Sequence, residues 1–138
     1  MTYDVAINIW TVVGAAAASF VVGMLWYGPV FGKTWMKLSG ISRADMKSMP
    51  LTPVQAMVGG AVTALLMAYV LAWLAQALIL LSASDAMRMA FWLWLGFFVP
   101  LTAGSWLWEG KPLRLFLFNA AHWLVALSAM SYVVVRWM

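Results

Sequence analysis

The feature that most constrains this chain is a series of four long apolar runs, separated by short breaks rich in glycine, proline and charged residues. A helix that crosses a membrane needs roughly 20 mainly apolar residues, and the runs cover residues 5–27, 54–81, 86–108 and 113–137. Only 9% of the residues are charged, against about a quarter in a soluble domain. We therefore expect an all-α integral membrane protein, one four-helix bundle over residues 1–138, made of two antiparallel helical hairpins.

The breaks between the runs contain residues that end or begin helices. We expect Gly28 and Pro29 to end the first helix. Pro53 is expected in the first turn of the second helix, where the missing N–H costs little. Ser82 and Asp85 have the spacing of a capping box before the third helix. The breaks thus support the same four spans as the apolar runs.

The positions of the basic residues predict the orientation of the bundle. With four spans, the first and third breaks lie on one side of the membrane, and they hold Lys33, Lys37, Arg43, Lys47, Lys111 and Arg114. The other side holds only Arg88 and Arg136. Lysine and arginine collect on the cytoplasmic side of membrane proteins. We therefore expect residues 28–53 and 109–112 in the cytoplasm and both termini outside.

The long break after the first span is predicted to lie along the membrane surface. Phe31 and Trp35 would rest on lipid, while basic side chains reach the headgroup phosphates. These basic residues are Lys33, Lys37, Arg43 and Lys47. Ser42 and Asp45 again have capping-box spacing. We expect a short amphipathic helix or turn within residues 28–53, with membrane lipids as its partner.

Small side chains recur at four-residue steps in the first two spans. The second span carries Ala56, Gly60, Ala64, Ala68 and Ala72, and the first carries Ala15, Ser19 and Gly23. Small residues let helix backbones approach closely in lipid, where the hydrophobic effect no longer drives association. These rows are either mutual packing faces of the first hairpin or an oligomer interface. We expect a homo-oligomer, with a twofold dimer favoured.

Polar residues within the second hairpin are the candidate functional site, because polar groups at membrane depth are costly. The candidates are Thr102, Ser105 and Glu109 on the third span, and Asn119 and His122 on the fourth. Their spacings of three and four place each set on one helix face. One interpretation is a transport or channel site, with His122 as a proton relay or ligand-binding group.

A structural interpretation of the same residues is simpler. Pro100 cannot donate a hydrogen bond to the carbonyl of Gly96. Asn119 or His122 on the neighbouring helix would then satisfy that carbonyl, since buried polar groups are normally paired. Glu109 would pair with Lys111 or Arg114 at headgroup level. The deeper tryptophans, Trp73, Trp92, Trp94 and Trp123, either fill interhelix space or line a cavity for lipid tails.

Several function classes have no support in these residues. The chain has one histidine and no cysteine, so a metal site within one chain lacks ligands, and a haem would need His122 from two chains. No carboxylate lies at the centre of a span, which argues against an exporter that uses an intramembrane acid. The basic residues form no dense face for nucleic acid. We expect no cofactor, no metal and no enzymatic activity.

Two stretches carry a family resemblance: "GMLWYGPVFGKTWMKLSG" at 23–40 and "WEGKPLRLFLFNAAHW" at 108–123. The chain resembles a bacterial family of small four-helix membrane proteins known only as a domain of unknown function. The most specific part of the likeness is a signature of Trp26, Tyr27, Gly28, Pro29, Phe31, Gly32 and Lys33. The resemblance implies a bacterial inner-membrane protein and implies no activity. We expect the Gly28–Lys33 turn to fold back against the bundle, over the end of the second hairpin near Glu109.

Together these features predict a non-catalytic membrane protein that acts by assembly, either as a homo-oligomer or as an accessory to a membrane partner. The alternative is a small transporter or channel built around the polar residues of the second hairpin. The similarity of "WYGP" (26–29) to "WEGKP" (108–112) leaves open whether the two hairpins are a repeat.

Overall fold

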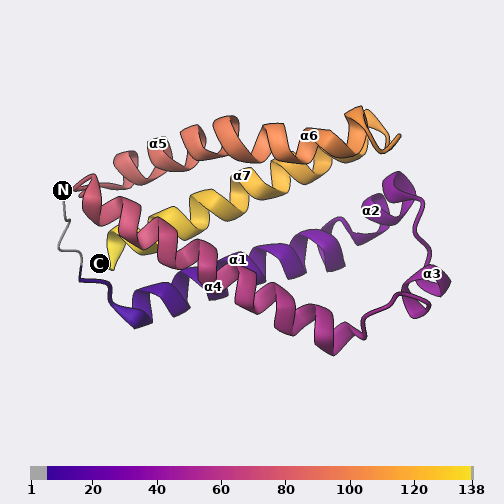
Figure 1. Cartoon of the computed structure of the whole chain (residues 1–138), viewed down its shortest axis with the longest axis horizontal. Helices are drawn as coiled ribbons and strands as arrows, with labels where there is room; N and C mark the ends of the chain where they lie inside the picture. The colour runs from indigo at the N-terminus through magenta and orange to yellow at the C-terminus, as the bar shows by residue number, and fades with distance from the viewer. Residues whose placement is uncertain (1–5, 138) are drawn as a thin grey trace.

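Four long helical spans form an elongated bundle in the computed structural model, which describes residues 6–137 apart from the side chain of Arg43 (Figure 1). All four are long and apolar enough to cross a membrane. The elements are α1 (Ile9–Leu25), η1 (Trp26–Val30), α2 (Gly32–Ser39), α3 (Arg43–Lys47), α4 (Pro53–Ala77), α5 (Ala83–Leu93), η2 (Trp94–Phe98), α6 (Val99–Leu107) and α7 (Leu113–Arg136). The expected all-α fold with four spans is confirmed, and no strand occurs within the described residues.

The start of α1 and the end of α7 lie at one end of the bundle, together with the turn between α4 and α5 (Figure 1). We call this the terminal end. The opposite end holds residues 28–52, which include α2 and α3, and the turn at residues 108–112. We call it the loop end. Two antiparallel hairpins therefore lie side by side, as expected from the four apolar runs.

The last helix, α7, is the centre of the bundle. It contacts α1, α4, α5, α6 and α2, and it carries the largest fully buried side chains, Leu127, Met130, Val134 and Ser131. Within the most apolar 18-residue stretch of α7, 44% of the residues are buried inside the molecule. The corresponding share is 22% in each of the first two spans. The core is therefore built around α7, with the other spans arranged against it.

The regular helix of the first span ends close to the point that the sequence predicted. Helix α1 runs to Leu25, and the backbone of Gly28 (φ −110°, ψ −113°) is not helical, so the segment η1 is a kink between two helices and the expected stop at Gly28 and Pro29 is confirmed. The chain then enters α2 directly. Gly32 makes this sharp exit possible, since a Cβ there would lie 2.9 Å from the carbonyl oxygen of Tyr27.

The expected surface segment forms two short helices. Helix α2 ends at Gly40, whose left-handed backbone (φ +72°) closes the helix. A full capping box of Ser42 and Asp45 begins α3. The backbone N–H and hydroxyl of Ser42 donate hydrogen bonds to the Asp45 carboxylate, at 2.8 and 2.9 Å, and they hold the pKa of that carboxyl below its usual value of 3.8.

The remaining helix bounds differ from the predicted runs by a few residues. The first helix begins at Ile9 behind the cap Asn8, and Val5 lies outside the described residues. The second ends at Ala77 because the backbone turns at Ile79 (φ 55°), although residues 78–81 are apolar. Ser82 caps the third span as expected, so its helix begins at Ala83. Pro53 is in the first turn of α4.

The small-residue row of α4 is divided between two environments. Ala64, Ala68 and Ala72 are buried in the core that α1, α4 and α7 share. Gly60 contacts Phe20 of α1, while Ala56 is exposed. This division determines where the molecule is hollowed.

Candidate functional site

A groove lies between α1 and α4, with α7 as its floor. Helix α4 crosses α1, and the two helices then separate toward the loop end (Figure 1). The groove has a cavity volume of about 680 Å³. It is lined by Ser19, Phe20, Gly23, Met24, Tyr27, Ala56, Met57, Gly60, Thr63, Ala64, Met67, His122 and Trp123. We call it the α1–α4 groove.

The floor of the groove holds the only histidine of the chain. His122 is 5% exposed, and neither Nδ1 nor Nε2 has a hydrogen-bond partner among the described residues. Its ring lies among aromatic rings, with centroid distances of 4.9 Å to Tyr27 and 4.8 Å to Trp123. Nε2 faces Gly23 of α1, since a Cβ on that glycine would lie 3.7 Å from it. The missing side chain at Gly23 leaves space in front of this nitrogen.

Tyr27 closes the groove at the loop end. Its hydroxyl donates a 2.7 Å hydrogen bond to Asn119 Oδ1 of α7. On its other side it lines a second cavity of about 570 Å³, which Lys33 and Trp35 also line. Tyr27 therefore stands between an apolar groove in the spanning part and a more polar cavity at the loop end.

The sequence profile of one family, described as protein of unknown function (DUF1761), matches residues 10–135. The chain belongs to the DUF1761 family. The match covers the four spans except for one residue at each outer end, and it includes both stretches that carried the resemblance. No curated protein and no solved structure matches the chain. Membership of DUF1761 confirms the family of unknown function that the sequence resembled, and any activity has to be argued from the site.

The five polar candidates do not meet in one place in this DUF1761 protein. Thr102 and Ser105 donate to carbonyls of their own helix, from Thr102 Oγ1 to Phe98 O at 2.6 Å and from Ser105 Oγ to Thr102 O at 2.9 Å. Glu109 is exposed and forms no ion pair or hydrogen bond within the described part of the chain, so the expected pairing with Lys111 or Arg114 is not seen. Only His122 lines the groove, with Asn119 beside it through Tyr27.

The expected hydrogen bond from Asn119 or His122 to the carbonyl of Gly96 is not formed. Gly96 lies in the π-helical turn η2 and is exposed, and a Cβ there would meet no atom within 4 Å. This turn changes the direction of the residues before Pro100, so Gly96 does not face α7. The two spans are instead joined by a 2.7 Å hydrogen bond from Trp94 Nε1 to the carbonyl of Ala120.

The signature residues pack against α7, as expected of a turn that docks on the second hairpin. The Trp26 ring lies 5.6 Å from that of Phe118, and the Phe31 ring lies 5.9 Å from it. Gly28, Pro29 and Lys33 are exposed. The turn is therefore held by its aromatic residues against Phe118, near the loop end of α7 in the second hairpin.

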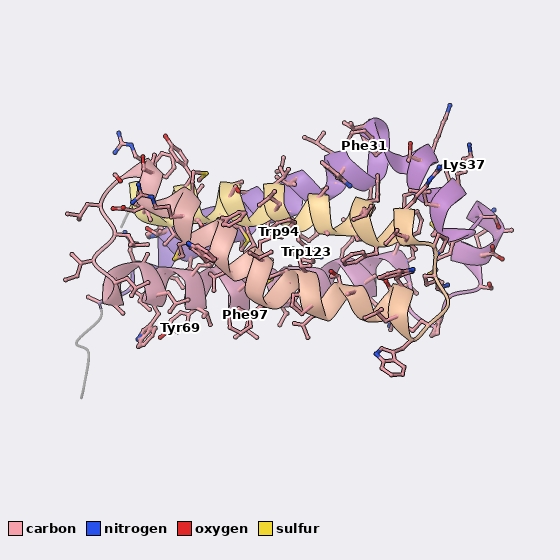
Figure 2. The ribbon with its side chains drawn as sticks, turned by 90° about the horizontal axis from the view of Figure 1, so that it is seen from above. Phe31, Lys37, Tyr69, Trp94, Phe97 and Trp123 are labelled. Carbon is pink, nitrogen blue, oxygen red and sulfur yellow. The ribbon has the colours of Figure 1, made fainter. Side chains whose placement is uncertain are left out.

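The residues assigned to lipid headgroups gather at the loop end. Lys33, Lys37 and Lys47 are exposed there, and Figure 2 shows Lys37 pointing away from the bundle. The side chain of Arg43 lies outside the described residues.

Farther along the bundle, Trp94 and Trp123 lie between the second-hairpin helices, while Phe97 and Tyr69 point outward (Figure 2).

Residues of the first hairpin form most of the groove, and the sequence did not single them out as a site. Gly23, Gly60 and Ala64 were assigned only to helix packing, and Thr63 was not singled out. The sequence did single out His122, on the floor of the groove, because it is a polar residue at membrane depth. The wall residues depend on how α1 and α4 cross, which cannot be predicted from a local sequence pattern.

Proposed function

We propose that this DUF1761 protein is a non-catalytic membrane protein that works by assembly with a second copy of itself. The contact face is the third span, formed by α5, η2 and α6. The observation that carries this proposal is the low burial of that span. Only 6% of the residues in its most apolar 18-residue stretch are buried inside the molecule, against 44% in α7.

The chemistry of the uncovered face supports a protein neighbour. Gly96 and Gly104 lie on this span, and a Cβ at either position would meet no atom within 4 Å. Leu101, between them in the sequence, is 78% exposed. Glycines on an open helix face allow a second backbone to approach closely in lipid, where van der Waals packing drives association. A twofold axis is the commonest way to pair such a face with itself.

The alternative of a transporter in the second hairpin has weaker support. Transport through this hairpin needs a chain of polar groups that is free to bind a passing solute. Thr102 and Ser105 use their hydroxyls on their own helix, and Glu109 lies exposed near the loop end. The polar residues are separated, so assembly is the function that the geometry supports better.

Cysteine cross-linking in membranes tests this proposal. The chain has no cysteine, so single variants such as Gly96→Cys, Leu101→Cys and Gly104→Cys report one position each. We expect at least one of them to give a disulfide-linked dimer on mild oxidation, because Cα atoms near a twofold axis come within the roughly 7 Å that a disulfide needs.

The matched controls are Val62→Cys and Leu66→Cys, which are equally exposed at mid-span on α4. These variants are expected to stay monomeric under the same oxidation. Equal cross-linking on α4 and on the third span would indicate random collision and contradict the proposal. A cross-linked product of a different mass would assign the face to another protein and contradict the second-copy version.

A further inference from the structure

We propose that the α1–α4 groove is a binding site for a molecule dissolved in the membrane that has a planar ring bearing an oxygen and an apolar tail, the chemistry of a quinone. His122 Nε2 hydrogen-bonds the ring oxygen. This site is separate from the assembly face on the third span, and it stands whether or not the protein assembles.

The unpaired imidazole is the first part of the argument. Leaving a buried polar group without a partner costs about 1–3 kcal/mol, and in lipid no bulk water is present to compensate. His122 is nine-tenths buried, and both ring nitrogens lack partners among the described residues. A ligand oxygen in the groove would satisfy Nε2, since a neutral imidazole offers one donor and one acceptor.

The walls of the groove select the rest of the ligand. Aromatic side chains of Phe20, Tyr27 and Trp123 line it, and aromatic faces and edges pack well against a planar ring. The thioethers of Met24, Met57 and Met67 also line it, and methionine adapts to irregular apolar shapes.

The absence of charged residues from the groove lining excludes an ionised headgroup as the ligand. None of the residues that line it is aspartate, glutamate, lysine or arginine. A carboxylate or phosphate placed there would be desolvated without a counter-charge, which is strongly unfavourable. A neutral oxygen on a ring needs only the hydrogen bond from His122. A fatty-acid or phospholipid headgroup therefore does not fit this part of the groove.

The size and opening of the groove fit entry from the lipid. A cavity of about 680 Å³ lies within the range of roughly 300–1,000 Å³ that small-molecule sites occupy. Met24 and Met57, on the two walls, are exposed, and both lie within the spanning helices. A ring could reach His122 between these walls while its tail remains among the acyl chains.

The test is binding of a decyl-substituted benzoquinone to the purified full chain in nanodiscs, followed by quenching of tryptophan fluorescence. We expect a saturable quenching component, because Trp123 lines the groove. Trp123→Phe is expected to weaken this component. Trp92→Phe is the matched control, since Trp92 is exposed on the third span, and it is expected to keep it.

Two substitutions test the role of His122 directly. His122→Phe is expected to weaken binding about tenfold through loss of the hydrogen bond, and His122→Gln to retain most of the affinity because the amide donates and accepts. Gly23→Leu is expected to abolish saturable quenching by filling the space in front of Nε2. Size-exclusion chromatography and circular dichroism check that each variant remains folded.

Three results would overturn the proposal. Quenching that rises linearly with quinone and is equal in all variants would mean partition into lipid only. Equal competition by decylbenzene, which has no oxygen, would exclude recognition through His122. Folded His122→Phe and Gly23→Leu variants that bind like the wild type would place the ligand elsewhere.

Discussion

Tyr27 joins three parts of the molecule through one side chain. Its hydroxyl donates to Asn119 of α7, and its ring makes edge contacts with Trp35 of α2 and Phe118 of α7. The end of the first span, the surface helix α2 and the central helix are thereby held together at the loop end. These contacts of Tyr27 dock α2 onto the bundle.

Removing the Tyr27 hydroxyl is expected to destabilise the protein. Tyr27→Phe leaves Asn119 without its partner, and interhelical hydrogen bonds in membrane proteins contribute about 0.6 kcal/mol on average and up to about 1.7. Reversible unfolding of the purified protein in mixed micelles measures the loss. Tyr69→Phe is the control, since Tyr69 is exposed on α4. A Tyr27→Phe value no larger than that of the control would contradict this role.

The sequence identified the polar residues of the second hairpin correctly, but it did not predict their hydrogen-bond partners. Asn119 and His122 stood out because polar side chains are rare at membrane depth. Their predicted partner, the Gly96 carbonyl, was wrong because the π-helical turn η2 rotates Gly96 away from α7. Insertion of one such turn depends on the packing of the whole span, so the identity of a hydrogen-bond partner does not follow from spacing alone.

At the scale of elements, one row of small residues on α4 has two environments. Toward the terminal end, Ala64, Ala68 and Ala72 are buried in the core shared with α1 and α7. Toward the loop end, Ala56 and Gly60 line the α1–α4 groove. The same four-residue repeat therefore allows close packing at one end and leaves space at the other, because the two helices cross at an angle.

Enlarging a buried member of this row is expected to disrupt the crossing. Ala68 is fully buried, and Ala68→Leu would insert a larger side chain where α1, α4 and α7 meet, at about 1–3 kcal/mol of stability. The same unfolding experiment measures the effect. Val62→Leu, at an exposed position of α4, should change the stability little. An Ala68→Leu protein as stable as the wild type would show that this crossing is not tightly packed.

Across the whole molecule, the charges and the termini divide between the two ends of the bundle. The loop end carries Lys33, Lys37, Lys47, Lys111 and Arg114, and the start of α1 and the end of α7 lie at the other end (Figure 1). This arrangement, with the positive-inside rule, predicts that the loop end faces the cytoplasm.

Reporter fusions in a bacterial host check this orientation. Alkaline phosphatase fused after Met138 should be active, and green fluorescent protein fused there should be dark, because the C-terminus is expected outside the inner membrane. The opposite pattern is expected when the reporters replace the chain from residue 50 onward, within the loop between α3 and α4. A fluorescent C-terminal fusion would reverse the predicted topology.

The sequence by itself determined the class of this protein, its four spans and the positions of most of its caps. These depend on local properties: the length of an apolar run against the thickness of a bilayer, and the preferences of Ser42, Asp45, Pro53 and Ser82 at helix ends. The tertiary structure alone decided that α7 is the centre, that Tyr27 bonds Asn119, and that His122 lies unpaired on the floor of a groove. Those features arise from the angles at which the helices cross, from the kink at Gly28 in η1 and from the π-helical turn η2. They depend on packing between segments that are distant in the sequence, so they cannot be predicted from the residues of any one segment.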